Sequence, residues 1–284
     1  MPKRSPRTTQ VVVISDLHVG STLGLCKPIV YLDDGQEYRA NRLQQEAWDY
    51  WASVFWKQVW KNKKDGAKTI VVVNGDLIDS RHHNTNQVFS SDVMEHINHA
   101  VEILDPIREK ADAFFVTRGT PAHVMASGAA DEQIARLVKA TKANGNPGGV
   151  RSSYHLKLNI DGCLFDIAHQ GPNPGFRMWT RGNTVRSFVR TIMLDALVRG
   201  ANPPAAVIRS HVHSKVHETV RDYGHVCEGI ITPSWQLKTE YAHQIASHED
   251  IADVGGVIIT LADSKIRDIE FRILQFAQTD YVEA

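Results

Sequence analysis

Carboxylate and imidazole side chains follow short apolar runs at several places in this sequence, and both groups are common ligands of divalent cations. Asp16 and His18 come directly after the run at 11–14. A single Asp or His in such a place is usually a turn former or a satisfied core residue. The occurrence of several such Asp and His residues at the ends of predicted strands indicates a metal centre. The candidate ligands are Asp16, His18, Asp76, His169, His211 and His213.

Local spacing predicts how two of these groups act. Residues two apart in an extended chain point the same way, so Asp16 and His18 are expected to converge on one ion. Gly75 lets the backbone bring Asp76 close to a cation, and a carboxylate has enough lone pairs to bridge two cations. Asp79 fits either a supporting role or a helix or turn cap, so it stays outside the ligand set.

The composition is that of a globular protein with balanced charge. Among 284 residues, 42% are hydrophobic, and 32 Lys and Arg residues balance 32 Asp and Glu residues. No charge field of one sign therefore draws the whole molecule to DNA or to an anionic membrane. The three cysteines are widely spaced and odd in number, which argues against a disulfide framework and indicates a reducing, cytoplasmic setting.

The chain is predicted to begin with a flexible tail. Residues 1–10 are basic and polar, and the apolar run that follows is too short for a signal-peptide core or a membrane span. No linker or repeat divides the remainder, so residues 11–284 are predicted to form a single domain.

The elements expected to hold the candidate ligands change in type halfway along the chain. Strands alternate with helices in the first half, whereas strands joined by turns, such as Asp161-Gly162, dominate the second. The predicted strands cover 11–14, 69–73, 114–117, 154–160, 163–168, 206–209, 226–231, 257–261 and 266–274. The predicted helices are a segment capped by Asn41, then 91–104, 131–139, and 184–199 between Asn183 as cap and Gly200.

In motif order, the sequence resembles the calcineurin-like metallophosphoesterase superfamily. That family carries Asp-x-His, Gly-Asp-x-x-Asp, Gly-Asn-His, a lone His and Gly-His-x-His, and the match here extends from residue 11 to about residue 213. The resemblance implies an α/β fold, a four-layer α-β-β-α sandwich of two mixed sheets flanked by helices. It also implies two metal ions at the C-terminal ends of the strands. One would be held by Asp16, His18, Asp76 and His213, and the other by Asp76, His169 and His211.

Two positions depart from the family pattern. The Gly-Asn-His block appears as Gly119-Thr120-Pro121-Ala122-His123, so Thr120 stands in place of the Asn that ligates the second metal. Either His123 or water fills that gap, and we expect His123 to keep the family role of contacting the phosphate or protonating the leaving oxygen. Ser210 replaces the Gly before His-x-His, a minor change if its backbone avoids positive φ. Arg118 matches a phosphate-contacting Arg of some family members, the alternative being a surface Arg.

The function expected from this resemblance is hydrolysis of a phosphate ester by a hydroxide that two metal ions activate. A phosphodiesterase is favoured over a phosphomonoesterase, with a small or nucleotide-like diester as substrate and nucleic-acid ends left open. Histidine and carboxylate ligands suit Mn²⁺, Fe, Zn²⁺ or Ni²⁺, and Mn²⁺ is the expected activating ion. The loop variant around Thr120 is similar to that of bacterial and phage-encoded members. The oligomeric state stays open.

Two alternatives compete with this interpretation. One is a Mn²⁺-dependent DNA exonuclease, against which stand the zero net charge and the roughly 70 residues that follow His213. The other is a non-catalytic interaction protein on the same fold, as in the retromer subunit of the superfamily. Retention of the histidine ligands argues against that alternative.

Overall fold

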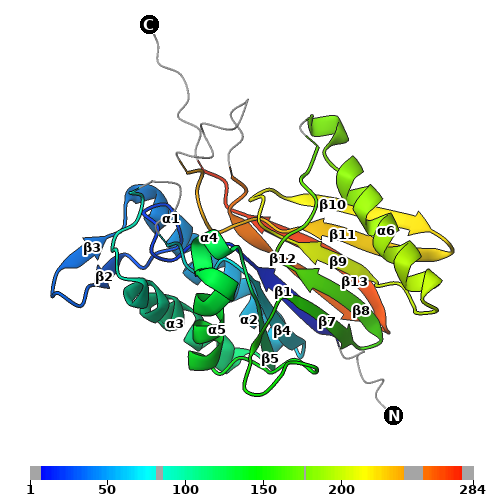
Figure 1. Cartoon of the computed structure of the whole chain (residues 1–284), viewed down its shortest axis with the longest axis horizontal. Helices are drawn as coiled ribbons and strands as arrows, with labels where there is room; N and C mark the ends of the chain where they lie inside the picture. Colours follow the sequence, from blue (N-terminus) through cyan, green and yellow to red (C-terminus); the bar gives the residue numbers. More distant parts are fainter. Residues whose placement is uncertain (1–7, 81–85, 176, 240–251, 277–284) are drawn as a thin grey trace, which may run out of the picture.

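Two mixed β-sheets form the centre of the molecule, which a computed structural model describes for residues 8–80, 86–175, 177–239 and 252–276 (Figure 1). The first sheet has the order β13-β12-β1-β4-β5-β6, in which β1, β4, β5 and β6 are parallel. Its strands are β1 (Thr9–Ile14), β4 (Lys68–Asn74), β5 (Ala113–Thr117), β6 (Ser152–Ser153), β12 (Gly255–Ala262) and β13 (Lys265–Ile273).

The second sheet has the order β10-β11-β9-β8-β7, with β8, β9 and β11 parallel. Its strands are β7 (His155–Ile160), β8 (Cys163–Ala168), β9 (Ala206–Arg209), β10 (Val216–Asp222) and β11 (His225–Ile231). The predicted Asp161-Gly162 turn joins β7 to β8 with positive φ at both residues, as this hairpin type requires. A separate two-stranded ribbon pairs β2 (Ile29–Tyr31) with β3 (Glu37–Arg39).

Helices cover the outer face of each sheet. Those on the first sheet, with short neighbours, are α1 (Arg42–Tyr50), η1 (Trp51–Phe55), α2 (Trp56–Lys64), α3 (Val93–Lys110), α4 (Pro121–Val124), η2 (Ala126–Gly128) and α5 (Ala129–Leu137). Residues 178–180 form the short η3, and α6 (Asn183–Val198) packs on the second sheet (Figure 1). None of the described helices combines the length and apolar character needed to cross a bilayer.

The core explains why the sheets pack together. Val11 and Val13 point from β1 toward Phe165 and Ile208 of the second sheet, whereas Val12 faces the helices. A strand buried on both faces must be apolar at every position, which is why the run reads as a continuous β-branched segment. The order is therefore helices, sheet, sheet, helix, and the predicted four-layer sandwich is confirmed.

Several element boundaries differ from the prediction. β1 begins at Thr9 rather than at residue 11, because Thr9 and Gln10 are buried and pair with β4 and β12. The predicted tail therefore cannot extend to residue 10, and residues 1–7 lie outside the described part. Asn183 is the first residue of α6 rather than its cap. β10 and the β2–β3 ribbon were not predicted, because their half-exposed sequences lack a continuous apolar run.

The helix after Asn41 contains an unpredicted π-helical turn. Asn41 and Gln44 form the capping box that starts α1, but the helix widens at η1 before continuing as α2. The rings of Trp51 and Phe55 in this turn lie 4.6 Å and 5.4 Å from the ring of Trp235. A π-turn accommodates one extra residue per turn, which lets both rings pack on that tryptophan.

Candidate metal centre

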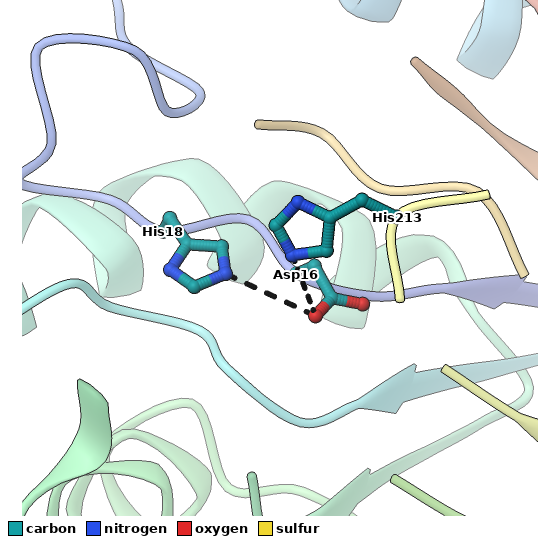
Figure 2. A group of neighbouring side chains, drawn as sticks. All are labelled: Asp16, His18 and His213. Carbon is teal, nitrogen blue, oxygen red and sulfur yellow. Dashed lines mark ion pairs between the residues drawn. The ribbon is translucent and has the colours of Figure 1, made fainter. Parts of the chain in front are cut away.

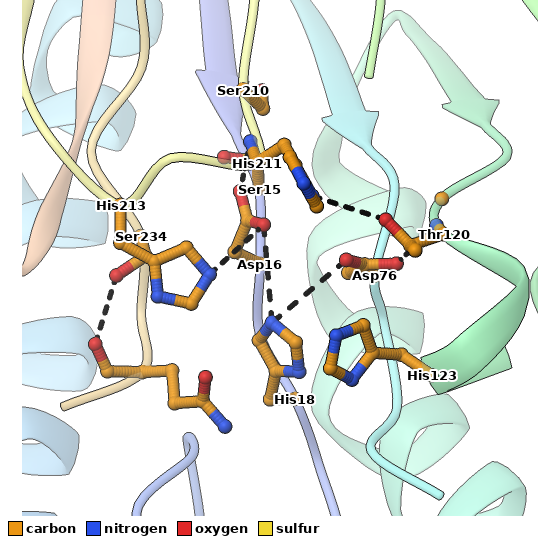
Figure 3. Close-up of polar contacts among 12 residues, drawn as sticks. Ser15, Asp16, His18, Asp76, Thr120, His123, Ser210, His211, His213 and Ser234 are labelled. Carbon is orange, nitrogen blue, oxygen red and sulfur yellow. Dashed lines mark hydrogen bonds and ion pairs between the residues drawn. The ribbon is translucent and has the colours of Figure 1, made fainter. Parts of the chain in front are cut away.

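The six predicted ligands meet at one edge of the two sheets, and Figure 3 labels all of them except His169. Asp16 follows β1 and Asp76 follows β4, which are parallel neighbours in the first sheet. His169 follows β8, and the two histidines at 211 and 213 follow β9, which are parallel neighbours in the second sheet. Carboxyl ends of parallel strands share an edge, so residues far apart in sequence are brought to one place.

Left-handed backbone directs most of these side chains into the centre. The residues with positive φ are Asp16 (53°), His18 (44°), Asp76 (51°), His211 (76°) and His213 (51°). Asp and His tolerate this region better than most residues, but such strain usually marks functional sites and costs about 1–3 kcal/mol per residue. It is held here by backbone bonds from Asp16 N to Gly75 O (3.0 Å) and from His18 N to Asp76 O (3.1 Å).

The expected convergence of Asp16 and His18 is confirmed, but its reason was wrong. The two side chains meet because both residues turn left-handed, and not because the segment is extended. Gly75 also has positive φ, and a Cβ there would lie 2.6 Å from the ring of His169. Ser210 is not among the described residues with positive φ, so its replacement of Gly is accommodated as expected.

Besides a group formed by His18, Asp79 and His123, two groups made only of predicted ligands are spaced as metal sites. In the first, Asp16 Oδ1 lies 3.9 Å from His18 Nε2 and 3.2 Å from His213 Nε2 (Figure 2). In the second, Asp76 Oδ2 lies 3.0 Å from His169 Nε2, with His211 completing the group. Asp76 Oδ2 is also 4.0 Å from His18 Nε2, so this carboxylate stands between the two groups.

Buried polar atoms without partners mark the same point. Asp16 Oδ1, His18 Nε2, Asp76 Oδ2 and His169 Nε2 are buried and make no hydrogen bond. Buried polar atoms are almost always satisfied, and a convergent set of carboxylate oxygens and imidazole nitrogens matches the ligand preference of transition-metal cations. The donor set therefore fits a pair of divalent cations.

The charges of the site favour cations as well. Burial alone would raise the pKa of Asp76, but His169 and His18 hold it down at about 2. Burial would lower the pKa of His18, yet Asp16 and Asp79 raise it to about 10, and Asp76 and Asp16 raise that of His169 to about 9 against the same effect of burial. Without metal, protons on these imidazoles balance the carboxylates, so the site demands positive charge.

Residues around the ligands fix their orientation. The Asn74 carbonyl oxygen lies 2.7 Å from His169 Nδ1, which turns Nε2 of that ring into the centre. Thr120 N donates to Asp76 Oδ1 (2.6 Å), and the Thr120 hydroxyl lies 3.1 Å from His211 Nδ1. Thr120 therefore contacts Asp76 through its backbone nitrogen and His211 through its side chain.

Asp131 is a buried acid that sequence reasoning missed. Its carboxylate accepts hydrogen bonds from Gly119 N (2.7 Å) and Leu77 N (3.3 Å), and so ties together the two loops that flank Asp76. Burial, with the nearby charge of Asp76, raises the pKa of Asp131 to about 7. Its only sequence signal was an acid in the first turn of a predicted helix, which is more often a surface residue.

His123 lies beside the six ligands. Its ring packs edge-on against that of His18, with centroids 4.6 Å apart, and its Nδ1 lies 2.8 Å from Asp79 Oδ1. Asp79 is buried, and its Oδ1 is also 3.5 Å from His18 Nδ1. Asp79 thus supports two imidazoles, a role that its position after Asp76 left open.

Arg118 makes several contacts outside the six ligands. Its guanidinium donates to Ser152 Oγ (2.8 Å), Ser127 O (2.8 Å) and Tyr154 OH (3.1 Å), and it lies 3.7 Å from Glu132. These bonds hold the loop before α5 against β6, and the phosphate contact expected of Arg118 stays a prediction.

Comparisons with known proteins place these features. No protein-family model matches the chain, and no curated protein matches it. Similar solved structures include a conserved uncharacterized protein from Streptococcus pneumoniae, described as a predicted phosphoesterase (10% identity, 95% of this chain, 91% of that chain, TM-score 0.38). They also include zinc-complexed Vps29 from Entamoeba histolytica (13%, 93% and 99%, 0.37) and a metallophosphoesterase from Sphaerobacter thermophilus (10%, 95% and 90%, 0.37).

These solved structures are similar to this chain over most of its length. At these identities and TM-scores, the likeness says nothing about substrate or activity. The geometry of the metal centre has to carry any functional statement.

Proposed function

We propose that this chain is a metal-dependent phosphodiesterase that uses two divalent cations. The observation that carries the proposal is the convergence of four buried, unpartnered ligand atoms at the strand ends. The first cation would be held by Asp16, His18, Asp76 and His213, and the second by Asp76, His169 and His211. When bound, the pair activates water and neutralises the phosphate oxygens.

The side chains of the site divide the remaining work. Asp76 Oδ1 is fixed by Thr120 N, so Asp76 presents Oδ2 to both groups of ligands. His123 has its Nδ1 engaged by Asp79, so in the doubly protonated ring Nε2 would supply the proton that the leaving oxygen takes up. Burial lowers the pKa of this ring, which favours release of that proton. His123 therefore acts as a general acid rather than as a ligand of the six-residue set.

Support for a diester substrate comes from the charges. A phosphodiester carries one negative charge, whereas a monoester carries up to two and needs more cationic contacts. Arg118, the cation expected to contact a phosphate, uses its Nε and Nη1 atoms in hydrogen bonds to Ser152 and Ser127. We infer a small or nucleotide-like diester as substrate and Mn²⁺ as the activating ion, since histidine and carboxylate ligands favour it over Mg²⁺.

The test compares bis-p-nitrophenyl phosphate with the p-nitrophenyl monoester. Metal-stripped protein is assayed after Mn²⁺, Ni²⁺, Zn²⁺ or Mg²⁺ is restored singly, with Asp76→Asn, an isosteric variant that loses the charge, as control. Mn²⁺-dependent cleavage that favours the diester and is absent in the control supports the proposal. Faster cleavage of the monoester, or no turnover with any metal, refutes it.

A further inference from the structure

Gln236 is a buried polar residue that contacts the carboxylate behind His123. It is 2% exposed, and its Nε2 lies 3.2 Å from Asp79 Oδ2 and 3.3 Å from Ser21 Oγ. An ionised carboxylate accepts hydrogen bonds and donates none, so the Gln236 atom that faces Asp79 is the amide nitrogen. Both of its protons therefore have acceptors in this buried place.

The backbone around Gln236 is anchored to the metal centre. Trp235 N donates to Asp16 O (3.0 Å), and Leu237 N donates to Leu23 O (2.9 Å). The hydroxyl of Ser234, whose side chain appears beside His213 in Figure 3, donates to the carbonyl of Gln236 (2.8 Å). Gln236 is thus held on both sides, and its amide keeps a fixed position relative to the ligand Asp16.

The two oxygens of Asp79 are consequently divided between two tasks. Oδ2 accepts from Gln236, and Oδ1 faces the Nδ1 atoms of His123 and His18 at 2.8 Å and 3.5 Å. The bond from Gln236 to Oδ2 restrains rotation of the carboxylate about the Cβ–Cγ bond, a terminal torsion that is otherwise broad, and loss of this bond would loosen the carboxylate. The imidazole of His123 would then lose the orientation that directs Nε2 toward the leaving oxygen.

We propose that Gln236 is a positioning residue for the general acid: its amide locks Asp79 and, through Asp79, the ring of His123. This inference rests on the proposed phosphodiesterase function. If Gln236 acts in this way, the effect of replacing it depends on the leaving group of the substrate. An acid matters when the departing oxygen is strongly basic and matters little when it is a stabilised anion such as p-nitrophenolate.

The experiment measures kcat of the Mn²⁺-loaded full chain with diphenyl phosphate and with bis-p-nitrophenyl phosphate, two diesters of equal charge. Gln236→Leu removes both donors at similar volume, and Gln236→Glu replaces a donor by an acceptor at equal length. For either variant, we expect the diphenyl rate to fall about 10-fold relative to the nitrophenyl rate, the low side of a general-acid effect because the acid itself remains. Metal content should stay at the wild-type value.

Three further variants sharpen the test. Ser21→Ala removes the other partner of the Gln236 amide and should leave the ratio of the two rates unchanged. His123→Ala should shift the ratio further than Gln236→Leu, and the double variant should show no more than the shift of His123→Ala, because both changes act on one step.

Opposite results overturn the inference. These are an equal fall with both substrates, loss of metal from the Gln236 variants, the same ratio shift in Ser21→Ala, or additive shifts in the double variant. If the wild type hydrolyses both diesters and the Gln236 variants keep its ratio, only this inference fails. If the wild type hydrolyses neither diester, the proposed function itself fails.

Discussion

A methyl group at position 119 should disable the metal centre by displacing Asp76. A Cβ added to Gly119 would lie 2.0 Å from Asp76 Oδ1, 2.2 Å from Asp76 N and 2.8 Å from Asp76 Cγ. Real Cβ atoms essentially never approach another heavy atom within 3.0 Å, so Oδ1 has to move by about 1.0 Å (3.0 Å minus 2.0 Å) and the backbone nitrogen of Asp76 by about 0.8 Å (3.0 Å minus 2.2 Å). Gly119 cannot retreat instead without breaking its bond to Asp131.

The size of the effect follows from that displacement. Oδ1 accepts from Thr120 N, so the shift also moves Oδ2 away from the two groups of ligands. A misplacement of about 1 Å costs about 100-fold in rate, and overpacking a tight site costs about 1–3 kcal/mol of stability. Gly119→Ala should therefore fold, unfold at a somewhat lower temperature and turn over about 100-fold more slowly.

The assay combines kcat on bis-p-nitrophenyl phosphate with metal content and thermal unfolding. Gly149→Ala is the matched control, because a Cβ there meets nothing within 4 Å and no positive φ constrains it. It should stay within about twofold of wild type, as surface changes rarely exceed about 0.5 kcal/mol. If Gly119→Ala keeps full activity and metal content, the tight contact between this loop and Asp76 does not set the position of the bridging carboxylate.

Five other predictions follow from the same geometry. Asp76→Ala should lower Mn²⁺-dependent turnover by more than about 100-fold, beyond the loss typical of a supporting residue, and retained turnover would refute the two-metal proposal. His123→Ala should slow diester hydrolysis by about 100-fold at unchanged metal content, whereas lost metal would identify it as a ligand. Loading Mn²⁺ at pH 8 should release protons, because His18 and His169 have pKa values of about 10 and 9 without metal and must be neutral to bind the ion. Calorimetry in two buffers of different ionisation enthalpy measures the number of protons released. Binding without proton release would contradict this prediction. By the same raised pKa, His18 stabilises the metal-free fold fully below about pH 6.5, and this stabilisation is lost as the pH rises toward 10, so the metal-free unfolding temperature should fall across that range. Arg118→Ala should lower the free energy of unfolding by about 1–3 kcal/mol and leave the KM for the diester unchanged. A large rise in KM would instead identify Arg118 as a substrate contact.

Much of the fold could be predicted because the strands near the site are buried on both faces. Strand β1 must be apolar at 11–14 to fill the space between helices and the second sheet, so its pattern is visible without a structure. Edge elements such as β10 have one exposed face and mixed sequences, so they were not predicted. The π-helical turn was hidden for another reason: it depends on packing against Trp235, more than 170 residues away.

By itself, the sequence determined which residue types stand at the strand ends, and therefore that Asp16, Asp76 and the histidines could serve one metal centre. Only the tertiary structure decided the partners of those residues. It bonded Arg118 to Ser127, Asp131 to the backbone of Gly119, and Gln236 to Asp79. Residues at strand ends can be recognised from the local apolar pattern of the strand that precedes them. A hydrogen bond between residues 157 positions apart depends on how distant segments pack, so no local pattern predicts it.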